Sequence, residues 1–299
     1  MINALTVDVE DYFQVTSFEN VVPRSQWDSR ESRVVAGTER LLELFAKHGV
    51  RGTFFILGWV AERFPQLVRR IDAAGHEIGC HGFWHRLTYD LSPQAFRDDL
   101  RRAKRSIEDA AGQPVTAFRA PSFSITRRSL WALEALVLEG FTIDSSIFPT
   151  THDRYGVPGA QPQAHLVETP AGPIAELPMT VVKFGRVAIP VGGGGYFRLY
   201  PLALTRRLLA RVNRVHGRPF VFYIHPWEVD PDQPRIRGGS LSSRFRHYVN
   251  LRSTARKLDK LLGGFRWGTV SEVARQSLGQ RLPTAIESPS PAVPALIRS

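Results

Sequence analysis

The chain has 299 residues, of which 43% are apolar, and it carries a formal net charge of +11 and a single cysteine. This length allows one sizeable core, so one main domain is expected, and the lone Cys80 excludes an intramolecular disulfide and an all-cysteine zinc site. No basic leader opens the chain, and its first apolar stretch ends at Asp8, too early for a signal peptide or a membrane span. We therefore expect a cytoplasmic protein.

The positive charge is concentrated between residues 235 and 260, where eight Arg and Lys side chains accompany one acid, Asp259. Such a segment is either an ordinary solvated helix and loop or a patch that attracts a polyanion or an anionic membrane surface. No zinc finger and no aromatic RNA-binding motif accompanies it, so nucleic acid is not the expected partner.

Apolar runs of strand length alternate with amphipathic stretches of helix length. The best-marked helix begins after the N-cap Ser92, has Pro93 at its first position and stops at Gly112. The expected strands, in chain order, are 4–9, 52–57, 77–80, 115–119, 141–144, 220–225 and 266–270, and the expected helices are 37–48, 65–74, 93–111, 127–139, 201–215 and 271–276.

This alternation predicts parallel strands covered by helices, and about seven such units favour a barrel over a doubly wound sheet. Residues 149–200 break the rhythm, and their scattered Pro and Gly predict an irregular insertion near the mouth of the site. The glycine run 192–195 lacks the residues of a phosphate loop, and with no helix expected directly after it, a lid or close backbone approach is favoured. Residues 279–299 are expected to form a disordered tail behind a domain that spans 1–278.

Polar side chains occupy the carboxyl ends of five expected strands, which is where parallel α/β folds place their functional groups. Carboxylates, imidazoles and a guanidinium at one edge are what a metal hydrolase requires. The residues concerned are Asp8, Glu10, Asp11, His81, His85, Arg119, Asp144 and His225.

His81 and His85 are separated by three residues, which lets both imidazoles reach one cation. Packing histidines also show this spacing, so a metal site needs a third ligand. The acids Asp8, Glu10 and Asp11 are the expected donors, with one carboxylate on the metal and another acting as general base. An exposed strand end with a turn at Asp11 is the alternative interpretation.

Taken together and in order, these residues resemble the polysaccharide deacetylases of the nodulation-type carbohydrate esterase family. The resemblance covers roughly residues 4–274 and implies a distorted (β/α)7 barrel that hydrolyses N-acetyl groups. The segments similar to the five family motifs are Thr6-Val7-Asp8 with Glu10 and Asp11, then His81 to His85, Arg119-Ala120-Pro121, Asp144-Ser145-Ser146, and His225 after an apolar strand.

The resemblance also implies a divalent metal cofactor. Imidazole and carboxylate ligands suit zinc best and tolerate cobalt or nickel. The metal ligands would be His81, His85 and either Asp11 or Glu10, because Asp8 is better suited to the role of base.

Two further roles follow from the same resemblance. Arg119 would orient Asp8 and keep it ionised, and His225 would protonate the leaving nitrogen. A nearby Asp144 carboxylate would favour the imidazolium form of His225.

The substrate implied is a polysaccharide that contains N-acetylhexosamine. Strings at 8–15, 193–198 and 225–230 resemble the branch found with bacterial exopolysaccharide and exosortase systems, so the basic segment 235–260 is expected to contact an anionic membrane or a polysaccharide synthase. The residues expected to contact the sugar are Trp84, Pro121, Ser122, Phe123, Tyr196 and Trp227.

Two other functions compete with this interpretation. One is an amidohydrolase of small amides or cyclic imides on the same barrel, which a closed pocket with an extra Arg or Lys would favour, whereas open aromatic surface favours a glycan. The other is a catalytically silent module that binds polyanions. The complete set of motif residues disfavours the silent module, because it has no chemical need for all of them.

Overall fold

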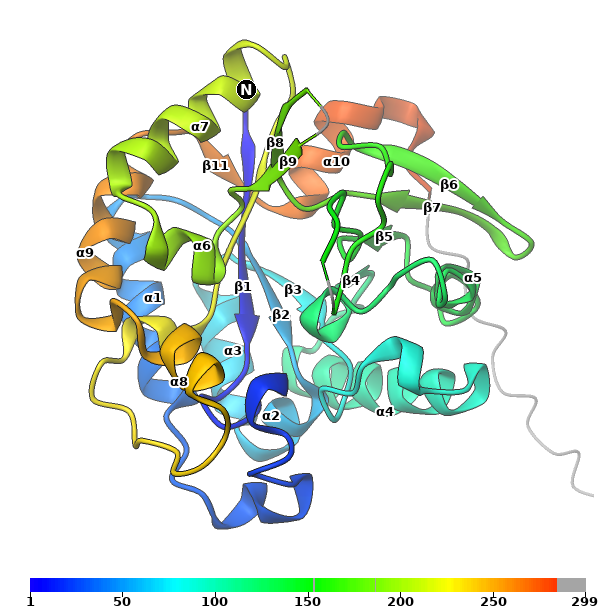
Figure 1. Ribbon diagram of the computed structural model, residues 1–299. Coiled ribbons are helices and arrows are strands. Elements are labelled where there is room, and N and C mark those ends of the chain that lie inside the picture. The colour runs from blue at the N-terminus through cyan, green and yellow to red at the C-terminus, as the bar shows by residue number, and fades with distance from the viewer. Residues whose placement is uncertain (153, 186, 284–299) are drawn as a thin grey trace, which may run out of the picture.

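The computed structural model describes residues 1–152, 154–185 and 187–283, and it consists of a parallel sheet with helices packed around it (Figure 1). The strand order of the main sheet is β10-β1-β2-β3-β4-β5-β7-β6, and β11 pairs with the start of β1. Strands from β10 to β7 run parallel to their neighbours, whereas β6 pairs antiparallel with β7. The strands are β1 (Asn3–Val9), β2 (Thr53–Ile56), β3 (Glu77–Cys80), β4 (Ala117–Phe118), β5 (Ile143–Asp144), β6 (His165–Thr169), β7 (Gly172–Glu176), β10 (Val221–Ile224) and β11 (Trp267–Gly268), with a separate hairpin of β8 (Val181–Phe184) and β9 (Val187–Pro190).

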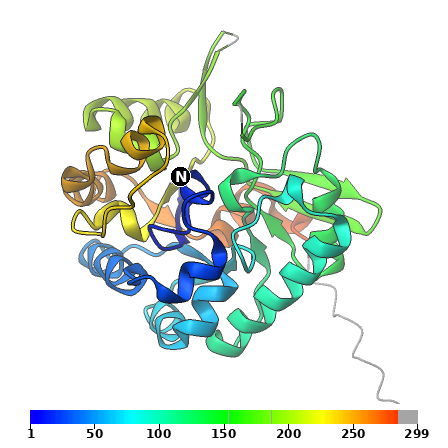
Figure 2. The same cartoon turned by 60° about the horizontal axis from the view of Figure 1, so that its bottom comes forward.

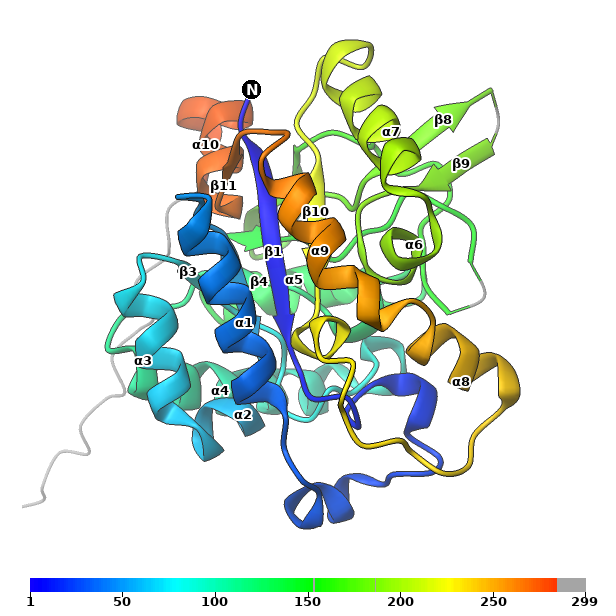
Figure 3. The same ribbon diagram turned by 90° about the vertical axis from the view of Figure 1, so that its left-hand side faces the viewer.

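Helices lie outside the sheet, as the view toward the carboxyl end of β1 shows (Figure 2). Figure 3 shows α1 and α9 on the outer side of β1 and β10. No helix in the described ranges is both long and apolar enough to cross a membrane. The helices are α1 (Val34–Lys47), α2 (Gly58–Arg63), α3 (Pro65–Ala73), α4 (Pro93–Ala111), α5 (Trp131–Leu138), α6 (Gly194–Leu199), α7 (Leu202–Arg214), α8 (Leu241–Tyr248), α9 (Leu251–Leu262) and α10 (Val270–Leu278).

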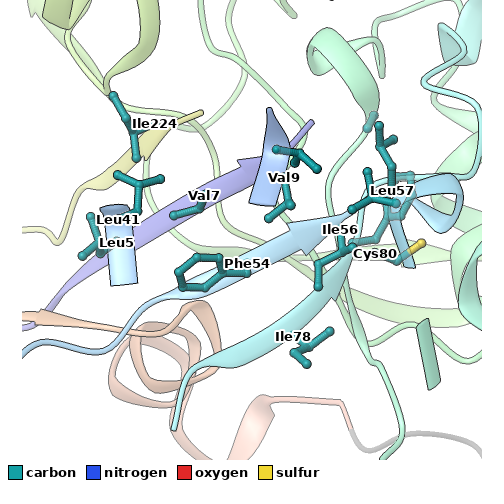
Figure 4. Packing of buried hydrophobic residues seen from close by; sticks show 14 of the residues in the cluster. Leu5, Val7, Val9, Leu41, Phe54, Ile56, Leu57, Ile78, Cys80 and Ile224 are labelled. Carbon is teal, nitrogen blue, oxygen red and sulfur yellow. The ribbon is translucent and has the colours of Figure 1, made fainter. Parts of the chain in front are cut away.

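The alternation of side chains along β1 divides the molecule into an outer and an inner core. Leu5, Val7 and Val9 belong to the large cluster that packs between sheet and helices, together with Phe54 and Ile78 (Figure 4). The residues between them face the other side of the strand, where a smaller cluster and several buried polar groups lie. Each large aliphatic side chain buried in the outer core contributes roughly 1.5–3 kcal/mol to folding. The outer core therefore fixes the strand, and the inner face is left for chemistry.

The expected α/β class, with parallel strands and covering helices, is confirmed. All seven expected strands and all six expected helices are present, with ends that shift by up to four residues. The ladder is interrupted between β7 and β10, where an isolated parallel bridge joins Gly193 to Tyr223. Short strands do form within the predicted insertion, but β7 is not an accessory element, because it pairs with β5 and continues the main sheet.

Three local predictions need correction or completion. The helix α6 opens at Gly194, within the glycine run 192–195 that was expected to lead into no helix. The basic segment 235–260 contains two helices, α8 and α9, and the turn after β2 contains the unpredicted α2. Of the predicted tail, 279–281 form a short 3-10 turn, and 284–299 lie outside the described residues.

Gly193 is required where α6 approaches β10. Its φ of 124° disfavours any residue with a Cβ, and an added Cβ would lie 1.9 Å from the carbonyl oxygen of Tyr223. The obstacle is backbone, which cannot rotate away as a side chain would.

We expect Gly193→Ala to lower the free energy of unfolding by about 3 kcal/mol or more. The matched control is Gly159→Ala, because Gly159 also has a positive φ but its added Cβ meets nothing within 4 Å. That variant should lose only about 1 kcal/mol. Denaturant unfolding of both proteins measures the difference, and equal losses would show that φ alone, not the contact with β10, requires glycine.

Candidate active site

The carboxyl end of β1 presents two buried acids on one side of the strand. Asp8 and Glu10 are two residues apart, so the pleat points both toward the inner face, and their exposed fractions are 2% and 3%. The chain turns sharply here, because the backbone N–H of Glu10 donates to the carbonyl of Asp8 at 3.0 Å. Buried carboxylates are costly without partners, so each must be compensated by its own surroundings.

Glu10 faces two imidazoles. Ligand atoms of Glu10, His81 and His85 all lie within 4.8 Å of one another. Glu10 Oε2 lies 2.7 Å from His85 Nε2, yet among the described residues this oxygen has no partner of hydrogen-bond geometry. The contact between these two atoms is therefore not a hydrogen bond along an N–H direction. Both atoms are instead placed as metal ligands would be, converging on a third atom.

The protonation of this group also fits a cation. The Nδ1–H of His81 donates to the backbone carbonyl of Arg119 at 2.7 Å, so Nε2 carries the lone pair on the inner side. Burial lowers the pKa of His81 to about 4, which keeps it neutral. Burial opposes ionisation of Glu10, but the facing His85 and His225 hold the pKa of this carboxyl well below its usual range. Two imidazoles and one carboxylate are a donor set that divalent metals accept.

Asp11, the other acid considered for the metal, has a different role. Its Oδ2 accepts hydrogen bonds from the Ser32 hydroxyl at 2.5 Å and from the backbone N–H groups of Arg33 at 2.9 Å and Val34 at 3.1 Å. Its Oδ1 accepts from the N–H of Tyr12 at 2.9 Å. Oδ2 therefore holds the start of α1, where unpaired N–H groups favour an anion, whereas Oδ1 holds the turn after β1. Glu10 is the acid that lies with the imidazoles.

The loop that carries the two histidines is fixed from several sides. The Asp99 carboxylate accepts from the backbone N–H of Phe83 at 2.7 Å, and the Arg24 side chain donates to the carbonyl of Trp84 at 2.7 Å. His85 has a positive φ of 52°. Trp84 packs against Trp27 and is not among the residues that line the cavity described below. Its expected contact with sugar is thus not supported by its position.

Asp8 is held by Arg119 across the inner face. Arg119 Nη1 donates to Asp8 Oδ1 at 2.7 Å and to the Thr6 hydroxyl at 2.6 Å. Its Nε and Nη2 donate to the carbonyl and hydroxyl of Ser145 at 3.1 and 3.0 Å. The guanidinium is completely buried and lies over the ring of Phe55. One oxygen of Asp8 is therefore fixed, and the other remains available on the cavity side.

His225, at the end of β10, faces both acids of β1. Its Nε2 lies 3.4 Å from Glu10 Oε1 and 3.9 Å from Asp8 Oδ2, and its Nδ1 lies 3.0 Å from Glu228 Oε2. The second oxygen of Glu228 accepts from Arg198 Nε at 2.6 Å. Burial lowers the pKa of His225, but Glu228 and Glu10 outweigh this effect and raise it to about 9. The imidazole is thus oriented by a carboxylate that an arginine holds in place.

The prediction that Asp144 supports His225 is corrected by this arrangement. Asp144 Oδ1 accepts from the Ser146 hydroxyl at 2.5 Å, and its residue lies opposite Glu176 in the register of β5 and β7. Asp144 Oδ2 and Glu176 Oε2 have no other partner. Burial and the neighbouring Asp144 raise the pKa of Glu176 well above its usual range, so the two carboxyls share a proton. Glu228 takes the place that was expected for Asp144.

A cavity of about 410 Å³ opens over these groups. Asp8, Glu10, His81, His85 and His225 all line it. Its walls are largely aromatic, and the hydroxyls of Tyr155 and Tyr196 meet at 2.9 Å. The other aromatic and small residues in the lining are Ser122, Phe123, Tyr223 and Trp227, whereas Pro121 is buried outside it.

Residues with strained backbone conformations cluster at this cavity. Within the described ranges, four non-glycine residues have a positive φ, and three of them, His85, Ser122 and Phe123, line the cavity. Such conformations cost about 1–3 kcal/mol each and persist where the surroundings fix them, as at functional sites.

Several residues of the site were not predicted. Glu228 and Arg198 orient His225, and Tyr155 and Tyr223 add to the wall. The sequence did contain a signal for Glu228, because a residue three positions after His225 can contact it within one helical turn. Tyr155 offers no such signal within an irregular segment.

The strand ends of this parallel α/β sheet bring two acids, three histidines and an arginine to one edge, a set of groups suited to hydrolysis. Residues 27–141 match the family described as "Polysaccharide deacetylase", and residues 145–275 match a domain of unknown function, DUF3473. The first half of the chain thus contains a polysaccharide deacetylase domain, as the motifs predict. Both matched segments contribute strands to the same sheet, so the DUF3473 segment is part of the sheet that holds the site.

Individual proteins show the same relationship. The chain is 33% identical over 98 residues to the peptidoglycan-N-acetylglucosamine deacetylase of Bacillus cereus, which covers 32% of this chain and 36% of that protein. It is 40% identical over 88 residues to the chitooligosaccharide deacetylase of Sinorhizobium fredii, covering 28% of this chain and 40% of that protein. The matched segments thus span less than half of each relative.

Two solved structures resemble the whole chain. A "putative polysaccharide deacetylase" from Mycobacterium smegmatis has a TM-score of 0.64 at 20% identity, covering 95% of this chain and 92% of that one. The PuuE allantoinase has a TM-score of 0.60 at 15% identity, covering 94% and 91%. At these identities the similarity shows the fold alone.

We expect Glu10→Ala to weaken zinc binding more than about 100-fold, because one of three converging donors is lost. Asp11→Ala should leave zinc affinity nearly unchanged while lowering the free energy of unfolding by about 1–2 kcal/mol, since it removes the anchor at the start of α1. Titration calorimetry with zinc and denaturant unfolding test both variants. Loss of zinc in Asp11→Ala with retention in Glu10→Ala would exchange the two roles.

Proposed function

We propose that this protein is a metal-dependent N-deacetylase of polysaccharides that contain N-acetylhexosamine. The observation that carries the proposal is the pair of acids on β1, which occupy two different environments within one cavity. Asp8 is fixed by a guanidinium, and Glu10 converges with two imidazoles. Asp8 thereby supplies the base, and Glu10, two residues later, supplies a metal ligand.

Hydrolysis of an amide requires an activated water, a stabilised oxyanion and a proton for the departing amine. Glu10, His81 and His85 would hold the divalent cation, for which zinc is the proposed identity. When bound, this ion supplies Lewis acidity at the acetyl group. Asp8 accepts the proton of the attacking water through the oxygen that Arg119 leaves free, and the hydrogen bond from Arg119 holds this carboxylate in its orientation.

His225 supplies the proton for the leaving nitrogen. Its Nε2 faces the same space as Asp8 and Glu10 from the end of the neighbouring strand β10, and Glu228 holds its Nδ1. A carboxylate at Nδ1 fixes the orientation of the ring and stabilises the imidazolium. Base and acid thus approach the scissile bond from two sides. The base can take a proton from the attacking water, and the acid can give a proton to the leaving nitrogen.

The cavity wall favours a glycan as substrate. The rings and hydroxyls of Tyr155 and Tyr196 lie in the cavity wall, where aromatic carbon can pack against pyranose rings. Trp227 also lines the cavity, but its ring is stacked on both His225 and His247, and its Nε1–H donates to Glu10 Oε1 at 3.2 Å. The two relatives described above are named for deacetylation of peptidoglycan N-acetylglucosamine and of chitooligosaccharide. We propose a polymer of the same chemical type, with exopolysaccharide biosynthesis as its setting.

Acetate release from N-acetylglucosamine oligomers and from exopolysaccharide extract should fall to background when a chelator removes the metal, and zinc should restore it. Asp8→Asn, His81→Ala and His225→Ala should each lower the rate by roughly 100-fold to 10,000-fold, because each removes one member of the set. Allantoin serves as the comparison substrate. Release that survives the chelator and all three substitutions would refute the proposal, and faster turnover of allantoin would favour a small cyclic substrate.

We expect Glu228→Gln to lower kcat at least tenfold with little change in KM, because His225 loses the anion that orients and charges it. Asp144→Asn is the matched comparison, since Asp144 contacts Glu176 and Ser146 and not His225. Its effect on kcat should be smaller. Both proteins need circular dichroism to verify folding. A larger loss in Asp144→Asn would restore Asp144 as the residue that supports the acid.

A further inference from the structure

The helix α8 exposes its apolar side chains to solvent. Leu241 and Phe245 are 82% and 61% exposed, and their spacing of four residues places them on one face. The opposite face packs inward through Ser243 and His247, which are buried. A surface helix of a monomeric protein normally has the reverse arrangement, with apolar side chains toward the core.

Arginines flank this apolar face. Arg244 and Arg246 lie on either side of Phe245 in the helix, and Arg237 precedes the helix in the chain, all of them exposed. None of these three forms an ion pair with another residue of the described parts of the chain. No acidic residue occurs between Asp232 and Asp259. The positive charge is thus not neutralised by the protein itself, and it is available to an external anion.

The position of α8 links this surface to the site. Figure 1 shows α8 at the end of the molecule where β1 ends, and Arg246 of α8 lines the cavity above the candidate metal ligands. The helix is held there by its buried face, where the His247 ring stacks on Trp227 with centroids 4.2 Å apart. A surface that engaged α8 would therefore lie beside the mouth of the cavity.

We propose that α8 docks the protein on an anionic lipid bilayer, with Leu241 and Phe245 inserted at the headgroup level and Arg237 and Arg244 on the anionic headgroups. An apolar stripe with arginines on both sides is the chemistry that a membrane interface accepts, because it offers hydrocarbon and negative charge within a few ångströms. A soluble polyanion would match the arginines but would leave the apolar pair in water. Docking does not depend on the proposed deacetylase activity, whereas the corollary that the glycan is reached at the membrane surface rests on it.

The test is sedimentation of the full chain with vesicles of phosphatidylcholine, with or without phosphatidylglycerol. The wild type should bind the anionic vesicles and bind neutral ones weakly. The double substitution Leu241→Ser/Phe245→Ser should weaken this binding at least tenfold, as expected for removing two apolar groups from the interface. Arg237→Gln/Arg244→Gln should weaken it by roughly fivefold per charge and reduce its dependence on salt.

The matched control is Leu138→Ser/Val215→Ser, which removes two side chains of 52% and 61% exposure, one at the end of α5 and one directly after α7. It should bind vesicles as the wild type does. Deacetylation of a soluble oligosaccharide by the Leu241→Ser/Phe245→Ser variant should be unchanged, which separates a failure of docking from a failure of the proposed chemistry. Absence of binding to anionic vesicles would overturn the proposal. Loss of binding in the arginine variant alone would also overturn it, because that result would identify a polyanion patch. Dissociation of a dimer by the apolar substitutions, without any effect on vesicle binding, would overturn it as well.

Discussion

The structure depends on one contact, the buried pair of Arg119 and Asp8. Arg119 directly follows β4 and Asp8 lies in β1, two strands that are separated in the sheet by β2 and β3, so the guanidinium reaches its partner across the inner face. A strand order that placed four strands flat in a row could not bring the two side chains to 2.7 Å. The contact is therefore a consequence of sheet curvature, and it also fixes that curvature.

This contact requires close compensation because it buries the positive charge of an arginine, which does not lose its proton. An arginine remains ionised in a protein interior, so each donor needs an acceptor. The acceptors are Thr6 and Asp8 of β1 and Ser145, which directly follows β5. Removing one partner of such a buried pair typically costs about 3–5 kcal/mol, because the other charge is then left without compensation. The group that orients the base thus also holds β1, β4 and β5 in register.

The second requirement is the parallel pairing of β1 with β10. It brings His225, from the segment that matches a domain of unknown function, beside two acids at the start of the chain. The deacetylase-matched segment contributes His81, His85 and Arg119, and so holds only part of the set. Neither segment could carry the proposed chemistry alone, and the sheet is what assembles it. Glu228 and Arg198 then complete the environment of the acid from within the DUF3473 segment.

The sequence allowed prediction of every central strand and of the edge at which the functional side chains meet. Those predictions succeed because hydrophobic period, helix caps and parallel topology are local or general rules. The choice between Glu10 and Asp11 could not be made in this way. Asp11 is removed from the imidazoles by N–H groups of residues 33 and 34, a contact across more than twenty positions that no local pattern reveals. The expected role of Asp144 failed similarly, because its partner Glu176 lies on a strand that had been assigned to an insertion.

The site shows how one residue type acquires several functions from its surroundings. Asp8, Glu10 and Asp144 are all buried carboxyls at strand ends, and burial alone would favour the neutral form of each. A guanidinium compensates Asp8, whereas imidazoles compensate Glu10 and lower the pKa of that carboxyl. Asp144 instead meets another carboxyl, so that pair keeps a proton and cannot supply a full second charge. Arg198 compensates Glu228, so the anionic character of the cavity is concentrated at Asp8 and Glu10, where a cation and an attacking water would lie. The carboxyl end of β1 therefore determines the chemistry of the whole edge.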